Sequence, residues 1–142
     1  DIRDYLMVMG GDNIFYFKLR DFADYFKEKK ADVVAVHRVT ETERLRRTGV
    51  ILMDKDSRLT LFQEKPANPV SELAVPPLYI FCRETLPLVA EYLREGNEAD
   101  APGNIISWLL RRRPVYGYIF RGGCYDIGDI ESYEKIKGGL PQ

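Results

Sequence analysis

The chain has few of the residues that bind soft metals or cross-link a fold. Among its 142 residues are two cysteines, Cys82 and Cys124, and a single histidine, His37. The cysteines lie far apart and form no metal-binding or redox motif, so reduced thiols are the simplest account. His37 lies inside an apolar strand-like segment, where a core or surface role is expected and a ligand role is not. These shortages argue against a cysteine- or histidine-based metal centre.

Long apolar runs and an excess of one charge are missing as well. No apolar run approaches the roughly 20 residues that a membrane-spanning helix needs, and no signal peptide is recognised. The formal net charge is −1, so no overall field draws the chain towards nucleic acid or a membrane surface. The basic cluster Arg111–Arg113 closes a predicted helix, where positive charge suits the helix dipole. We therefore expect a cytoplasmic protein with no nucleic-acid or membrane partner.

What the chain does have is the composition of a globular domain with a real core, at 45% hydrophobic and 30% charged residues. Apolar, β-branched runs alternate with segments whose apolar residues recur at helical spacing. The early order of strand, helix and strand is typical of a parallel α/β unit. Strands are predicted at 6–9, 32–39, 78–82 and 115–120, a hairpin within 49–66, and helices from residue 19 to about 30 and at 85–95, 104–112 and 130–137.

Two acids follow predicted strands at glycine turns. The segment LMVMGGDNIF, residues 6–15, ends a short strand at two glycines and then delivers Asp12. The segment RGGCYDIGD, residues 121–129, repeats the pattern with Asp126. Acids beyond the carboxyl ends of buried strands are where open α/β sheets hold their chemistry. If both strand ends open on one cleft, the pair can hold Mg²⁺; the alternative is two unrelated turn acids.

A third candidate site ends the predicted hairpin. Glu64 and Lys65 close its second strand, and Pro66 cannot continue that strand. Adjacent strand residues point to opposite faces, so both side chains reach one ligand only if the strand bends there. A carboxylate that accepts sugar hydroxyls, beside an ammonium that meets phosphate, would suit a sugar phosphate. The alternative is an ordinary charged strand end.

The hairpin turn itself carries an Asp-x-Asp spacing, at Asp54 and Asp56, that invites comparison with a calcium loop. The comparison fails, because the positions that need glycine and glutamate hold Leu59 and Lys65. A solvated turn is the expected structure.

Five segments in this order resemble the sugar-1-phosphate nucleotidyltransferase family, and above all its glucose-1-phosphate thymidylyltransferases and uridylyltransferases. They are GGDNIF, TGVILMDKDSRLTLFQEKP, VPPLYIF, DAPGNIISWLLRRRPVYGYIF and YDIGDIESY. Each motif alone is weak, but together they cover nearly the whole chain. The resemblance implies a mixed, mostly parallel α/β sheet of the nucleotide-sugar-transferase, Rossmann-like type. It also implies the transfer of a nucleotidyl group from a nucleoside triphosphate to a sugar 1-phosphate such as glucose 1-phosphate, with release of pyrophosphate.

The family's site residues carry over to matching positions. Asp12 and Asp126 match the acids that hold Mg²⁺, and Lys65 matches the lysine on the sugar phosphate, so the resemblance implies that these three are catalytic. The implied mechanism is in-line attack of the sugar phosphate on the α-phosphorus, with catalysis mainly by positioning and electrostatics. The sugar-binding positions that the resemblance implies are Gly49, Glu64, Lys65, Val75 and Tyr79.

The chain departs from the family pattern in two places. The glycine-rich loop with an arginine and a lysine, which cradles the triphosphate in the family, is not found within residues 1–142. We therefore expect residues 1–142 to form the sugar-phosphate and metal portion of a domain whose sheet is truncated at the amino end. Such a chain would be inactive alone, and would form a homo-oligomer or associate with the missing segment. Secondly, Pro76 and Pro77 replace a small residue and a glycine, which removes backbone donors to the sugar.

Two other functions fit the same residues. The chain could be a non-catalytic relative that senses sugar phosphates, or a structural fragment that self-associates through a sheet edge. The presence of both metal acids together with Glu64 and Lys65 favours the enzyme, since a sensor does not need both acids. The base, the sugar and the oligomeric state are left open by the sequence.

Overall fold

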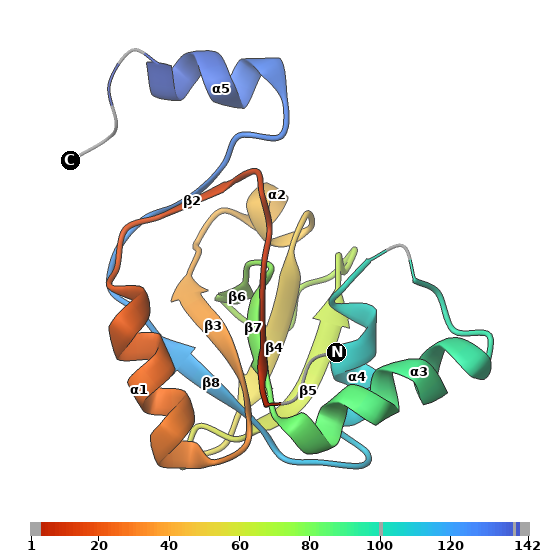
Figure 1. Ribbon diagram of the computed structural model, residues 1–142. Helices are drawn as coiled ribbons and strands as arrows, with labels where there is room; N and C mark the ends of the chain where they lie inside the picture. The colour runs from red at the N-terminus through yellow and green to blue at the C-terminus, as the bar shows by residue number, and fades with distance from the viewer. Residues whose placement is uncertain (1–3, 100, 138, 140–142) are drawn as a thin grey trace.

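The computed structural model describes residues 4–99, 101–137 and 139. The chain forms a mixed sheet with helices on both faces (Figure 1). In chain order the elements are β1 (Leu6–Met9), β2 (Asn13–Phe15), α1 (Leu19–Lys29), β3 (Asp32–Arg38), α2 (Thr42–Leu45), β4 (Gly49–Met53), β5 (Leu59–Glu64), β6 (Leu73–Val75), β7 (Leu78–Phe81), the 3₁₀ turn η1 (Arg83–Thr85), α3 (Leu86–Arg94), α4 (Asn104–Leu109), β8 (Val115–Ile119), β9 (Cys124–Asp126) and α5 (Ile130–Lys137).

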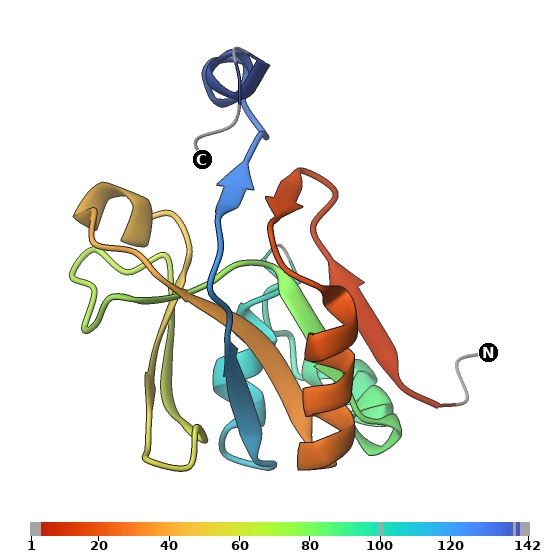
Figure 2. The ribbon, with the colours of Figure 1, turned by 90° about the vertical axis from the view of Figure 1, so that its left-hand side faces the viewer.

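The alternation of side chains along β3 and β7 builds two hydrophobic cores. Val33 and Ala35 face the core under α1, whereas Val34 and Val36 face the core under α3 and α4. Successive strand residues point to opposite faces, and both faces here are covered by helices (Figures 1 and 2). The centre of β3, residues 33–36, is therefore an unbroken apolar run, as expected for a strand buried on both faces.

The sheet is α/β and mixed, as predicted, but the prediction that it is mostly parallel is wrong. Its strand order is β1-β7-β3-β6-β4-β5, and β8 pairs with β3. Among the described strands only β3 and β8 pair in parallel; the other pairings are antiparallel. β1 and β3 do run in the same direction, as the early strand-helix-strand order predicts. The antiparallel strand β7 lies between them and bonds to both.

The residues Pro76 and Pro77 separate β6 from β7 in this sheet. β6 and β7 both pair with β3 and are joined only by Pro76 and Pro77. On its other edge β6 pairs with β4, whereas β7 pairs with β1. Neither proline can donate a ladder hydrogen bond, although the Pro77 carbonyl accepts one from Gly10 at 2.8 Å. The strands on the two sides of the prolines therefore have different partners, and the candidate site lies at this break.

A buried carboxylate ties the sheet to the helices. Asp32, fully buried at the start of β3, accepts hydrogen bonds from the Cys82 amide at 2.7 Å and from the Thr85 hydroxyl at 2.7 Å and 2.8 Å. Arg113 approaches it at 3.8 Å. Helix α4 ends earlier than predicted, at Leu109, so the basic cluster lies in the turn beyond it. One member of that cluster therefore pairs with a buried acid.

The two cysteines and the hairpin turn have the local structure predicted from the sequence. Cys82 and Cys124 are free and buried. The Asp54 carboxylate accepts hydrogen bonds from the amides of Asp56 and Arg58, which is turn geometry and not a calcium loop.

The antiparallel pair β2 and β9 leads away from the main sheet and carries α5 above it (Figures 1 and 2). None of the helices in the described part of the chain has the length and apolar character that crossing a membrane requires.

Candidate active site

A cleft of about 770 Å³ lies at the break in the sheet. Its walls come from the β1–β2 turn, the starts of β4 and α4, the end of β5, the Pro76–Pro77 link, β7, β9 and α5. All the site residues predicted from the sequence line it, and they are Asp12, Gly49, Glu64, Lys65, Val75, Tyr79 and Asp126.

The β2–β9 pair brings the two predicted metal acids together. Asn13 lies opposite Asp126 in the ladder, and the Ile127 amide donates a hydrogen bond to the Asp12 carbonyl at 2.8 Å. A methyl group placed on Gly128 would lie 2.9 Å from Asp12 Oδ2 and 3.0 Å from Asp126 Oδ1. Asp12 Oδ2 and Asp126 Oδ1 therefore lie close to one common point, and the distance between them cannot exceed the sum of these two distances. Both carboxylates are exposed on the same side of the cleft.

This pair suits a hard divalent cation that keeps other ligands. Mg²⁺ binds one or two carboxylates and completes its octahedron with water and substrate phosphates. The missing side chain of Gly128 leaves space at the point that both carboxylates flank. In the described part of the chain no group of three or more acidic, histidine or cysteine side chains forms a closed cage. The donor set therefore fits a cation shared with a phosphate ligand better than a structural ion.

The chain bends where Glu64 passes to Lys65, which resolves the alternation problem raised by the sequence. Lys65 has a φ of +43°, and its amide donates a hydrogen bond to the Thr48 carbonyl at 3.1 Å. Because the strand leaves extended geometry there, adjacent side chains can border one cleft. Glu64 is half-buried and Lys65 is exposed, and both line the cleft.

The Glu64 carboxylate is enclosed by two glycines and a tyrosine. Gly49 is its partner across the β4–β5 ladder, and a methyl group on Gly103 would collide with Glu64 Oε2. Burial raises the pKa of Glu64, and the neighbouring Lys65 charge partly opposes the rise. Burial, and secondly the Glu64 carboxylate, raises the pKa of Tyr79, whose hydroxyl stays protonated. The cleft therefore presents a partly desolvated acceptor at its inner end.

Gly49 and Val75 have packing roles that the motif does not reveal. A methyl group on Gly49 would lie 2.6 Å from the Phe62 ring, so the position has no room for a side chain. Val75 is buried, and its carbonyl accepts a hydrogen bond from the Thr48 hydroxyl at 2.9 Å. These contacts fix the ends of β4 and β6 at the cleft wall.

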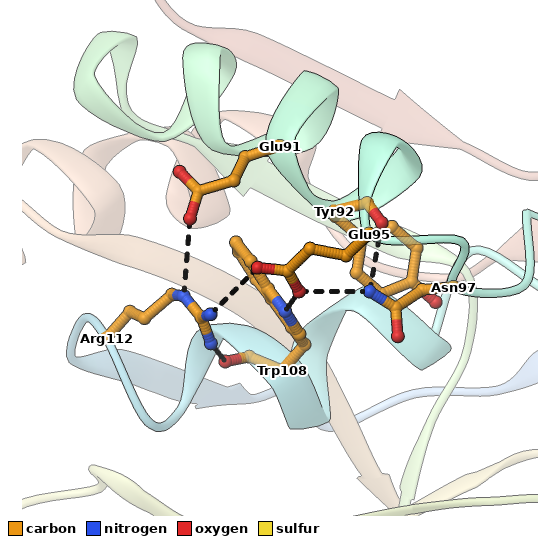
Figure 3. Close-up of polar contacts among 6 residues, drawn as sticks. All are labelled: Glu91, Tyr92, Glu95, Asn97, Trp108 and Arg112. Atoms are coloured by element: carbon orange, nitrogen blue, oxygen red, sulfur yellow. Dashed lines mark hydrogen bonds and ion pairs between the residues drawn. The ribbon is translucent and has the colours of Figure 1, made fainter.

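Helix α4, which carries Gly103 at its start, is held from two sides. Ser107 Oγ donates a hydrogen bond to the Phe62 carbonyl on β5 at 2.9 Å. On its other side Trp108 Nε1 donates to Glu95 Oε2 at 2.7 Å, and the Arg112 guanidinium lies 3.5 Å from the Trp108 ring centroid (Figure 3). Arg112 also pairs with Glu95 at 3.3 Å. These contacts fix α4 between β5 and α3, and Gly103 at its amino end lies against the Glu64 carboxylate.

Sequence reasoning missed several residues of the cleft. His37 is buried, as expected, but it lies at the cleft wall with its ring stacked on Phe120 at 5.3 Å. Burial, and secondly the Arg44 charge, lowers the pKa of His37 to about 4, so its ring is neutral at pH 7. Arg44 and Arg47 also line the cleft. Both arginines belong to the polar segment 39–47, whose charges follow no sheet or helix period.

The comparisons with known proteins agree with this fold. The chain belongs to the nucleotidyl transferase family, whose model matches residues 1–141. It is 32% identical over 133 residues to a glucose-1-phosphate adenylyltransferase of Desulfitobacterium hafniense strain Y51, covering 92% of this chain and 33% of that protein. It is 34% identical over 133 residues to that of Clostridium acetobutylicum, covering 91% and 35%. The chain thus spans about a third of the length of these curated relatives.

Solved structures show the same fold. A protein assigned as a glucose-1-phosphate thymidylyltransferase from Bacillus anthracis, in complex with a sucrose, matches with a TM-score of 0.79 at 23% identity, over 99% of this chain and 58% of that one. UDP-glucose pyrophosphorylase complexed with UDP-glucose matches with a TM-score of 0.79 at 22% identity, over 96% and 56%. At such identities the likeness establishes the fold alone. The family predicted from the five motifs is confirmed by the family match over residues 1–141.

Proposed function

We propose that the cleft is the sugar-phosphate and metal portion of a sugar-1-phosphate nucleotidyltransferase site. The observation that carries the proposal is the meeting, in one cleft, of the acid pair Asp12 and Asp126 with Glu64 and Lys65. Glucose 1-phosphate is the first candidate substrate, since glucose-1-phosphate enzymes are named among the relatives of this chain. The nucleoside triphosphate would supply the nucleotidyl group.

Each side chain has a distinct task in the proposed reaction. A phosphate oxygen of the sugar 1-phosphate attacks the α-phosphorus in line, the bond from that phosphorus to the bridging oxygen breaks, and pyrophosphate leaves. The Lys65 ammonium orients the attacking phosphate, and the Glu64 carboxylate accepts hydrogen bonds from sugar hydroxyls. Asp12 and Asp126 would hold Mg²⁺, which supplies charge neutralisation at the phosphates. No covalent bond to the protein is required.

Lys65→Ala is expected to weaken glucose 1-phosphate binding roughly 10- to 150-fold. The variant loses a charge-assisted contact to phosphate, and such contacts contribute about 1.5–3 kcal/mol. The measurement is a calorimetric or NMR titration of the chain with glucose 1-phosphate in the presence of Mg²⁺. Lys55→Ala, in the β4–β5 turn away from the cleft, is the matched control and should leave the affinity unchanged.

Equal affinities of the wild type and Lys65→Ala for glucose 1-phosphate would contradict the assignment of the phosphate site. Tight binding of the sugar phosphate with no dependence on Mg²⁺ or on Asp12 and Asp126 would instead favour a sugar-phosphate sensor. A pyrophosphate-release assay with each nucleoside triphosphate then identifies the base.

A further inference from the structure

α2 and the turn after it carry three arginines, Arg44, Arg46 and Arg47, and their surroundings differ. The Arg44 guanidinium lies 3.7 Å from Glu41 and donates to the Cys124 carbonyl at 3.3 Å. Arg46 pairs with Glu43 at 2.6 Å and donates to the Ala67 carbonyl at 2.9 Å. Both side chains are therefore held by acceptors within the protein.

Arg47 differs from both neighbours. Its side chain is exposed and borders the cleft. Within residues 4–99, 101–137 and 139, its guanidinium has neither a hydrogen bond nor an ion pair, whereas its backbone amide donates to the Arg44 carbonyl at 3.1 Å. A guanidinium offers five donors in a planar fork, which is the geometry that binds two oxygens of one phosphate. Arg47 is therefore a cation at the cleft without an acceptor in the described structure.

The backbone places Arg47 beside Lys65. The Lys65 amide donates to the carbonyl of Thr48, the residue that follows Arg47, at 3.1 Å. The next pair in the same ladder is Gly49 with Glu64. The start of β4 and the end of β5 thus bring two cations to one wall of the cleft. The Lys65 ammonium makes no hydrogen bond or ion pair with a described residue, although its charge lowers the pKa of the adjacent Glu64.

Two neighbouring cations repel each other, and an anion between them removes that cost. The half-buried Glu64 carboxylate lies against Gly103. It therefore serves the inner end of the cleft. A phosphate monoester carries close to two negative charges at neutral pH. Such a group could accept hydrogen bonds from the ammonium and from the guanidinium fork together.

We propose that Arg47 is a second phosphate-binding residue, which with Lys65 clamps the phosphate of the sugar 1-phosphate from the start of β4. The inference rests on the proposed function, since it assigns a further residue to the same site. The ligand class is a phosphate monoester, and a terminal phosphate of the triphosphate or pyrophosphate shares its chemistry. The experiment must therefore separate these two sources.

The test compares Arg47→Gln with Arg46→Gln in titrations of the chain with glucose 1-phosphate, inorganic pyrophosphate and glucose. Arg47→Gln is expected to weaken glucose 1-phosphate binding about tenfold, and to leave pyrophosphate and glucose binding unchanged. Arg46→Gln, whose guanidinium is already paired, should change none of the three. Arg47→Lys should recover part of the affinity, because it keeps the charge but loses the two-oxygen contact. Urea unfolding of each variant verifies that the fold is intact.

Two outcomes overturn the inference and spare the proposed function. One is a Lys65→Ala variant that loses glucose 1-phosphate affinity while Arg47→Gln keeps it. The other is an Arg47→Gln variant that loses pyrophosphate binding alone, which would place Arg47 on the triphosphate side. If neither Lys65→Ala nor Arg47→Gln changes glucose 1-phosphate binding, the proposed phosphate site itself is wrong.

Discussion

Replacing Asp12 or Asp126 by Asn is expected to remove the divalent-cation site. Each change deletes one of the two carboxylates that flank Gly128, and a neutral amide oxygen is a much weaker ligand for Mg²⁺ than a carboxylate. We expect at least a tenfold loss of Mg²⁺ or Mn²⁺ affinity in the chain, measured by calorimetry or by the paramagnetic signal of Mn²⁺. In any preparation that turns over, the rate of pyrophosphate release should fall about 10²- to 10⁴-fold, because a metal ion supplies several kcal/mol of charge stabilisation.

The matched control for this prediction is Asp56→Asn. Asp56 lies in the exposed β4–β5 turn, outside the cleft, and belongs to the spacing that fails as a calcium loop. Its replacement should leave cation binding unchanged. If Asp56→Asn weakened binding and the two cleft variants did not, the cation site would lie in the turn and the assignment of Asp12 and Asp126 would be wrong.

The second large effect concerns stability. Asp32→Ala is expected to lower the free energy of unfolding by about 3–5 kcal/mol, because it removes one partner of a buried, hydrogen-bonded pair. The Thr85 hydroxyl and the Cys82 amide would lose their acceptor, and Arg113 would lose its counter-charge. Urea unfolding followed by Trp108 fluorescence measures the change.

Asp32→Asn separates the hydrogen bonds from the charge. Asn keeps an oxygen for the Thr85 and Cys82 donors, so it should cost much less than Ala. Burial raises the pKa of Asp32 despite hydrogen bonds from Cys82 and Thr85 that oppose the rise, so the folded chain holds this proton more tightly than the unfolded chain. The stability that this group contributes is therefore greatest at low pH, and is lost as pH rises from the unfolded value of about 3.8 towards the raised folded value. A wild type whose stability shows the same pH dependence as Asp32→Asn would contradict this account.

Local structure could be predicted because its causes are local. The period of apolar residues predicted β3, α1 and the strands around Leu78 and Val115. The glycine turns indicated both acids of the cleft, Asp12 and Asp126. The order of strands could not be predicted in the same way. β3 and β7 are both apolar runs buried on two faces, and such runs look alike in parallel and antiparallel sheets. Nothing in the residues of β3 or β7 predicts that β7 lies between β1 and β3.

The missed residues of the cleft have a different cause. Arg47 and His37 reach the cleft because neighbouring strands end beside them, and a strand's end is defined by its partner as much as by its own residues. The pair Pro76–Pro77 was the one feature of the sequence that indicated where the cleft forms. Prolines inside a strand mark an edge or a break, and here the break is where the cleft forms. The sequence interpretation treated them only as lost donors to the sugar.

The central claim is that one cleft binds both the sugar phosphate and the cation, and NMR titration of the chain tests it most directly. Glucose 1-phosphate should shift the amide resonances of Gly49 and Lys65, and Mg²⁺ should shift those of Asn13 and Gly128. The Trp108 indole N–H, held by Glu95 in the cluster between α3 and α4, should respond to neither. Shifts confined to the Trp108 region, or a cleft whose resonances stay fixed at saturating sugar phosphate and Mg²⁺, would contradict the claim.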